Sequence, residues 1–192
     1  GFIDVPSLVA AGSAAGPIKI VAANYQKPPY CIFSLDPGAN IDNAKKLVNL
    51  ELGSSSASFL PRIWAAVMEM NGVDSKTMKV VNIDAPARVP MLAARKVPSI
   101  DLFIMSEPAI KRAVPDAKPV CLFAGDLGLE IYANSIGVHE DFLKANPDVV
   151  KKFLKAFVRG LKDTAKDPST AVDSVLKRND VAKKPVELER LR

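Results

Sequence analysis

The sequence has few of the residues that carry enzymatic chemistry. Its 192 residues include two cysteines and one histidine, His139. Two cysteines are too few for the disulfide framework of a small secreted domain. Metal sites need several His, Cys or carboxylate ligands at fixed spacing, and a Ser–His or Cys–His nucleophile would depend on His139 alone. We therefore expect no catalytic residue, no metal and no cofactor, and a protein that is not an enzyme.

Long apolar runs are missing as well. No stretch approaches the roughly 18 uninterrupted apolar residues that are typical of a membrane-spanning helix. At the same time 48% of the positions are hydrophobic, whereas disordered chains combine few apolar residues with high net charge. The length suits one large or two small domains with a buried core. The sequence predicts a folded globular protein.

The basic charge is confined to one end of the chain. The formal net charge is +5, yet residues 1–140 hold equal numbers of basic and acidic side chains, so the whole excess lies in residues 141–192. There, lysines alternate with apolar residues at steps of three and four, which is typical of an amphipathic surface helix. A nucleic-acid stripe would favour arginine and exposed aromatic side chains. We expect no nucleic-acid partner.

Short apolar segments alternate with helical patterns along the chain, which predicts an α/β fold with a mainly parallel sheet. Proline at positions 147 and 168 suits the first turn of a helix. The expected strands are 18–23, 30–35, 78–83, 100–105, 120–123 and 131–138, and the expected helices include 87–96, 107–114, 140–145, 147–165 and 168–178.

Three consecutive serines form the most informative segment. Ser54, Ser55 and Ser56 follow Gly53 at the end of an expected strand, and we expect them to open a helix that runs to about Met70. The first N–H groups of a helix lack intrahelical partners and carry positive partial charge, so this place suits an anionic or carbonyl-bearing ligand. The alternative is ordinary N-capping, which serine also favours.

Other polar residues follow expected strands, where open α/β sheets bind ligands. Asp4 and Ser7 lie at a strand-to-helix junction, and Glu107 follows an apolar strand. Each carboxylate is either a ligand contact or a helix-start charge, and for Asp84 the capping role is favoured. Tyr25 either stacks on a ligand ring or packs at a strand end.

Cys31 and Cys121 both lie inside apolar strand runs. We expect two buried thiols, with a disulfide as the alternative.

Six stretches along the chain resemble one known family. They cover residues 1–8, 21–27, 53–56, 81–84, 91–97 and 142–148. In order and spacing they resemble the solute-binding proteins of ABC transporters that take up nitrate, sulfonates, taurine and thiamine-pyrimidine precursors. The resemblance covers nearly the whole chain.

The resemblance implies a periplasmic-binding-protein type II-like fold, in which two α/β lobes joined by crossing strands close on a ligand. Residues 30–130 would form lobe 2, whereas 1–29 and 131–192 would be parts of an incomplete lobe 1. The chain is too short for two complete lobes, so we expect it to be truncated at both ends. By position, Asp4, Ser7, Tyr25, the three serines and Glu107 match ligand contacts of the family.

The implied function is the solute-binding component of an ABC uptake system, which binds a small anionic or heteroaromatic ligand by hinge closure. Its partners would be that ligand and a membrane permease, and its location the periplasm or a lipid-anchored extracytoplasmic site, with the signal segment not in this chain. One alternative is a pyrimidine-synthesis enzyme on the same scaffold, but residues 125–130 lack the cysteine cluster of that branch. Another is a truncated, non-transporting binding module, with a homodimer covering the exposed core.

Overall fold

The computed structural model describes residues 1–55 and 58–191 of the chain. The chain forms two compact units: unit 1 consists of Gly1–Asn24 and Asn134–Arg192, and unit 2 of Tyr25–Ala133. The chain therefore passes between the units twice. At this passage the Asn24 N–H donates to the Asn134 carbonyl at 3.0 Å, and the Ala133 N–H donates to the Tyr25 carbonyl at 3.1 Å. That lobe 2 begins at residue 30 and ends at 130 stays a prediction.

Unit 1 is built on a three-stranded sheet. Its order is β1 (Phe2–Asp4), β8 (Asn134–His139) and β2 (Ile18–Ala23), and both pairings are antiparallel. Gly137 lies in the central strand, where an added Cβ would come 2.9 Å from Ile3 Cγ2 and 3.1 Å from Ile18 Cγ2. A glycine at this position lets the two isoleucines from the edge strands approach each other across β8.

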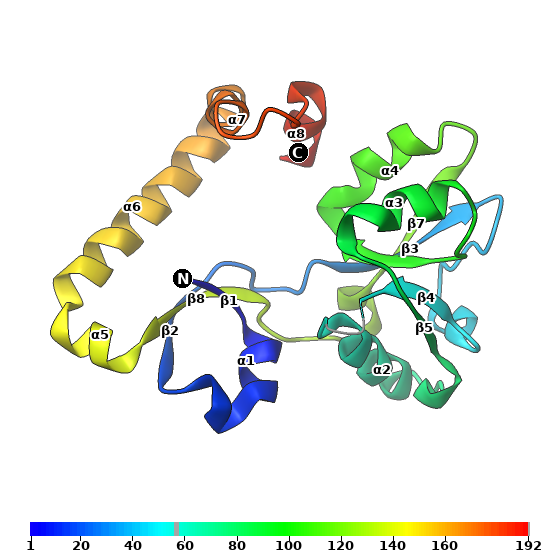
Figure 1. Cartoon of the computed structure of the whole chain (residues 1–192), viewed down its shortest axis with the longest axis horizontal. Coiled ribbons are helices and arrows are strands. Elements are labelled where there is room, and N and C mark those ends of the chain that lie inside the picture. Colours follow the sequence, from blue (N-terminus) through cyan, green and yellow to red (C-terminus); the bar gives the residue numbers. More distant parts are fainter. Residues whose placement is uncertain (56–57, 192) are drawn as a thin grey trace. The chain divides into compact units, whose positions relative to one another are not determined.

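Helices complete unit 1. They are α1 (Val5–Ala11), α5 (Glu140–Ala145), α6 (Pro147–Lys166), α7 (Pro168–Leu176) and α8 (Lys184–Arg190), the last of which we did not expect (Figure 1). Both α6 and α7 begin on proline, as the sequence predicts. The apolar side of α6 is only partly covered, because Val150 is buried whereas Phe153 and Leu161 remain about half exposed.

Unit 2 contains a five-stranded sheet with the order β5 (Lys79–Asn82), β4 (Glu51–Ser54), β6 (Ile100–Phe103), β3 (Tyr30–Asp36) and β7 (Lys118–Phe123). β4 is parallel to β5 and β6, while β3 is antiparallel to both β6 and β7. Four strands therefore run in one direction and β3 runs against them. The expectation of a mainly parallel sheet is wrong for unit 1 and for β3. The alternation of strands and helices along the sequence does not determine the direction in which each strand runs relative to its neighbours.

Both faces of this sheet are covered. The side chains of β3 alternate between two core clusters, with Tyr30 and Ile32 on one face and Cys31 and Phe33 on the other. The helices of unit 2 are α2 (Leu60–Met70), α3 (Ala85–Ala93) and α4 (Glu107–Ala113). Trp64 of α2 is fully buried in the first cluster. A strand buried on both sides explains the continuous apolar run that predicted β3.

The two cysteines are bonded to each other. Cys31 of β3 and Cys121 of β7 form a disulfide, with their Cα atoms 5.4 Å apart. The prediction of two buried thiols is therefore wrong. The reason is strand register: Cys31 lies opposite Phe123 and Cys121 opposite Phe33, which puts both cysteines on one face of adjacent strands.

Candidate functional site

Four of the five strands of unit 2, namely β4, β5, β6 and β7, have their carboxyl ends along one edge of the sheet. β4, β5 and β6 are parallel, so the residues that follow them lie at the same edge. Ser54 ends β4, Asp84 precedes α3 after β5, and Glu107 begins α4 after β6. Of the candidates in unit 2, Ser54, Ser55 and Glu107 thus gather at the edge where α/β sheets bind ligands.

The expected helix does not begin at Ser54. β4 continues through Ser54, which pairs with Asn82, and α2 begins only at Leu60. The hydroxyl oxygen of Ser58 accepts a hydrogen bond from the Leu60 N–H at 3.2 Å. The expectation was wrong because pairing with β5 extends the strand beyond Gly53, a tertiary contact that the local sequence does not show. Ser55 is half-buried directly after the strand, and Ser56 lies outside the described residues.

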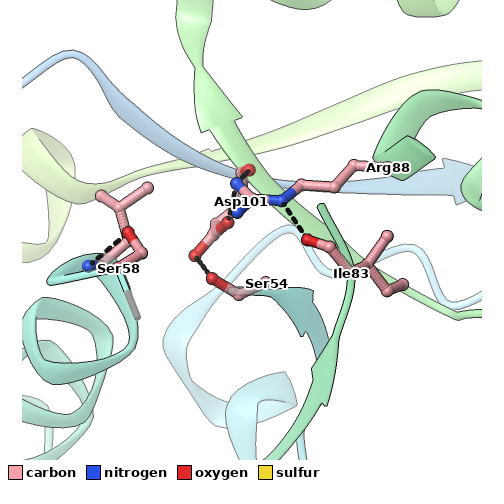
Figure 2. A network of polar contacts seen from close by, with 6 residues as sticks. Ser54, Ser58, Ile83, Arg88 and Asp101 are labelled. Atoms are coloured by element: carbon pink, nitrogen blue, oxygen red, sulfur yellow. Dashed lines mark hydrogen bonds and ion pairs between the residues drawn. The ribbon is translucent and has the colours of Figure 1, made fainter. Parts of the chain in front are cut away.

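Ser54 is fully buried and belongs to a polar network (Figure 2). Its Oγ donates to Asp101 Oδ2 at 2.6 Å, and Arg88 Nη1 donates to Asp101 Oδ1 at 2.8 Å. The same Nη1 donates to the Asp101 carbonyl at 3.0 Å, and Arg88 Nε donates to the Ile83 carbonyl at 3.2 Å. The network joins the end of β4 to β6 and α3.

The ion pair in this network is nearly excluded from water. The Arg88 side chain is 6% exposed and that of Asp101 is 1% exposed. Burial raises the pKa of Asp101, against the opposing effects of the Ser54 hydrogen bond and the Arg88 charge. Because the Ser54 hydroxyl uses its only hydrogen in the bond to the Asp101 carboxylate, its oxygen can only accept hydrogen bonds from any other group.

Sequence reasoning did not single out Arg88 or Asp101 as site residues. A signal for Asp101 was present, since a carboxylate inside the apolar run of an expected buried strand needs a charged or hydrogen-bonding partner. Arg88 could not be identified as that partner, because the contact depends on how α3 packs beside β6.

Gly53 sits beside the network where no side chain fits. A Cβ there would lie 3.0 Å from Ile83 Cδ1, 3.1 Å from Ile100 Cγ2 and 3.1 Å from the Ser99 carbonyl. The Gly53 N–H donates to that same carbonyl at 2.8 Å. The close approach fixes the path of β4 just before the serines.

Asp4 and Ser7 lie together in unit 1. Asp4 Oδ2 accepts a hydrogen bond from the Ser7 N–H at 2.8 Å, so Asp4 is the N-cap of α1. Across the sheet, Asp4 pairs with Asn134, the first residue of β8. The side-chain oxygen of Asn134 is buried and has no hydrogen-bond partner. Asn134 is a polar candidate that sequence reasoning missed, because it lies inside the expected strand 131–138.

The other candidates have ordinary structural contacts. Tyr25 is half-buried and packs against the core cluster that contains Trp64. Glu107 forms an ion pair with Lys111 at 2.8 Å in the first turn of α4. Asp84 is the N-cap of α3 but makes no side-chain capping hydrogen bond. His139 Nδ1 accepts a hydrogen bond from the Asp141 N–H at 3.3 Å at the start of α5. Tyr25 and Glu107 belong to unit 2, whereas Asp4 and Ser7 belong to unit 1.

Within residues 1–55 and 58–191, no cluster of three or more His, Cys, Asp or Glu side chains could hold a metal ion. In the same residues, none of the helices has the length and apolar character needed to cross a membrane.

The model of the family described as NMT1/THI5 like matches residues 1–171. The chain belongs to this family. A curated relative, the riboflavin-binding protein RibY of Chloroflexus aurantiacus, is 29% identical over 162 residues, which cover 82% of this chain and 44% of the relative. The family member described here thus spans less than half the length of that protein.

Solved structures show the fold. The periplasmic aliphatic sulphonate binding protein SsuA from Escherichia coli is 12% identical, with a TM-score of 0.81 over 100% of this chain and 64% of that one. The desulfurization enzyme DSZB is 16% identical, with a TM-score of 0.60 over 97% of this chain and 70% of that one. The family member therefore has the α/β fold of periplasmic binding proteins, as the family resemblance implies, and the same fold also occurs in an enzyme.

Proposed function

We propose that the chain is part of the solute-binding component of an ABC uptake system, which binds a small ligand by hinge closure. The observation that carries the proposal is membership of the NMT1/THI5 like family over residues 1–171, together with the fold match to a periplasmic binding protein. The double passage between two compact units supports a hinge, because a few residues at element ends can absorb the rotation of one unit relative to the other.

The proposed ligand contacts are the residues that the sequence predicts as candidates. In unit 1 they are Asp4 and Ser7, and in unit 2 they are Tyr25, Ser54, Ser55, Ser56 and Glu107. Ser55 would contact the ligand directly, since it is half-buried right after β4. Ser54 would act mainly through its hydrogen bond to Asp101, which holds the end of β4 in place.

We further propose that the ligand is heteroaromatic and not a simple oxyanion. The relative with 29% identity is described as riboflavin-binding, whereas the sulphonate-binding structure is 12% identical. Tyr25, which is half-buried and follows β2 in the chain, is the candidate aromatic residue for stacking on a ligand ring.

The proposed location is extracytoplasmic, with a membrane permease as the partner that receives the ligand. The Cys31–Cys121 disulfide supports this location, since disulfides persist mainly in oxidising compartments. A homodimer is not part of the proposal.

We propose binding without catalysis, although one solved structure with this fold is an enzyme. Two features support this choice. The single histidine accepts a backbone hydrogen bond at the start of α5, and both cysteines are used in the disulfide. His139 Nδ1 and the two cysteine sulfurs are thus already engaged in structural contacts.

A ligand panel tests the proposal. Thermal unfolding of the chain is measured separately with riboflavin, an aminopyrimidine, taurine, butanesulfonate and nitrate. A ligand present at 100 times its Kd should raise the free energy of unfolding by about 2.7 kcal/mol. We expect riboflavin or the aminopyrimidine to raise the Tm and to be recovered chemically unchanged. If no compound in the panel raised the Tm, the result would contradict a solute-binding function. Chemical conversion of a compound would show that the protein is an enzyme.

A pair of serine variants tests the site. Ser55→Ala should weaken ligand binding tenfold or more. Ser58→Ala should leave the affinity unchanged, because the Ser58 hydroxyl accepts a hydrogen bond from the first residue of α2. Equal affinity of both variants would remove Ser55 from the site.

A further inference from the structure

Asn134 carries a polar atom whose environment is incomplete. Its Oδ1 is buried and has no hydrogen-bond partner. A buried amide oxygen without a donor costs about 1–3 kcal/mol, and native proteins keep few such atoms. A retained orphan acceptor therefore indicates a missing donor, which is either a water molecule or a ligand.

The position of Asn134 favours a ligand. It is the first residue of the central strand of unit 1, directly opposite Asp4 of β1, and its carbonyl accepts the Asn24 N–H that follows β2. Paired residues in an antiparallel sheet place their side chains on one face, with Cβ atoms about 4.5–5.5 Å apart. Asn134 thus lies next to Asp4, a proposed ligand contact, at the end of the sheet where β1 leads into α1.

Two oxygen acceptors lie at this place, the Asp4 carboxylate and Asn134 Oδ1. The Asp4 carboxylate already accepts the Ser7 N–H at the start of α1, and Asn134 Oδ1 awaits a donor. A sulfonate or nitrate would bring its own negative oxygens against a carboxylate and an amide oxygen, which is unfavourable in a partly desolvated site. A ring N–H, by contrast, offers the donor that Oδ1 lacks.

We propose that Asn134 binds the ligand, and that its Oδ1 accepts a hydrogen bond from a ring N–H of a neutral heteroaromatic ligand such as an imide or an amino-heterocycle. This inference rests on the proposed solute-binding function. It adds a residue and narrows the ligand class to donor-bearing rings.

The test uses riboflavin, whose ring carries one imide N–H, together with its N3-methyl derivative and butanesulfonate. Binding of each to the chain is measured by titration calorimetry. For the unaltered chain we expect riboflavin to bind at least tenfold more tightly than the N3-methyl derivative. For Asn134→Leu we expect the affinity for riboflavin to fall at least tenfold and the two flavins to bind with similar affinity, because the oxygen that accepts the N–H hydrogen bond is missing.

Stability separates a ligand contact from a structural role. Since Asn134 Oδ1 has no partner in the free protein, Asn134→Leu should leave the Tm unchanged or raise it. Asn179→Leu, on the segment between α7 and α8, serves as a matched control that should alter neither flavin affinity nor the preference for the N–H.

Each other outcome is decisive. Unchanged riboflavin affinity in Asn134→Leu, or a large drop in its Tm, overturns the ligand role of Asn134. Tight binding of butanesulfonate without riboflavin binding overturns the ligand class while the solute-binding function stands. Binding of neither probe, with silence across the wider panel, contradicts the proposed function itself.

Discussion

Arg88 and Asp101 form an ion pair inside unit 2, with Nη1 2.8 Å from Oδ1 and almost no exposure of either side chain. The pair is embedded in further hydrogen bonds, from Ser54 to the carboxylate and from Arg88 to the Ile83 carbonyl. These bonds satisfy the groups that burial removes from water, which a buried pair needs if it is not to destabilise the fold. Their position beneath the end of β4 makes them the support of the proposed serine contacts.

Removing one member of this pair should be costly. Arg88→Met leaves the Asp101 carboxylate buried without its cation, so we expect a loss of about 3–5 kcal/mol in the free energy of unfolding. Urea unfolding followed by circular dichroism measures it. Lys79→Met is the control, because the Lys79–Glu51 pair is exposed and should contribute about 0–1 kcal/mol. Equal losses in the two variants would show that burial does not set the cost.

Ser54→Ala should be destabilising in a pH-dependent way. Burial raises the pKa of Asp101, so the folded state holds this proton more tightly than the unfolded state, and stability falls as pH rises between the unfolded and folded pKa values. The Ser54 hydrogen bond opposes the rise, so its loss raises the folded pKa further. Ser54→Ala should therefore lower the free energy of unfolding most when the pH is above the folded-state pKa of Asp101. The loss should become smaller as the pH falls through that pKa, because the carboxylate is then protonated.

Urea titrations between pH 4 and 8 measure this dependence. Ser58→Ala provides the comparison, because its hydroxyl accepts from a backbone N–H and no carboxylate is involved. Its cost should be the same across that range. A pH-independent cost for Ser54→Ala would contradict the coupling to Asp101.

Gly53→Ala should destabilise unit 2 by about 1–3 kcal/mol, because the new methyl group would press on Ile83, Ile100 and the Ser99 carbonyl. Gly160→Ala makes the same change in α6, where an added Cβ meets nothing within 4 Å. There we expect a gain of up to about 1 kcal/mol from higher helix propensity. Thermal unfolding of the two variants should give shifts of opposite sign, and shifts of the same sign would contradict the packing argument.

Replacing both cysteines by serine should lower the free energy of unfolding by about 2–5 kcal/mol, because the disulfide closes a long loop with a sequence separation of 90. A thiol assay on the unfolded, unreduced chain should find no free thiol. A reducing agent should lower the Tm of the unaltered chain and leave that of the double variant unchanged. Titration of two thiols would refute the pairing.

Local patterns predicted some of the individual elements directly. The apolar run 18–23 gave β2 with its observed bounds, and Pro147 marked the first residue of α6. Apolar periodicity and proline act within a few residues of their own position, so the sequence carries them directly.

What escaped prediction depends on contacts between distant residues. The direction of β3, the pairing that extends β4 through Ser54, and the Cys31–Cys121 register are set by neighbouring strands. The same holds for the candidate site. Candidate positions near strand ends could be predicted from the sequence. The role of Arg88 depends on its distant partner Asp101, and Asn134 stands out only because its buried Oδ1 lacks a partner.

The disulfide also determines how unit 2 responds to mechanical force. Residue 31 lies six positions after the chain enters the unit, and residue 121 lies twelve before it leaves at Ala133. A pulling load applied through these two ends would travel from β3 to β7 across a single covalent bond. The sheet interior, α2, α3 and α4 all lie on the bypassed loop. Tension that stretches the connections to unit 1 would therefore extend only the short flanking segments and leave the Ser54–Asp101–Arg88 network unloaded.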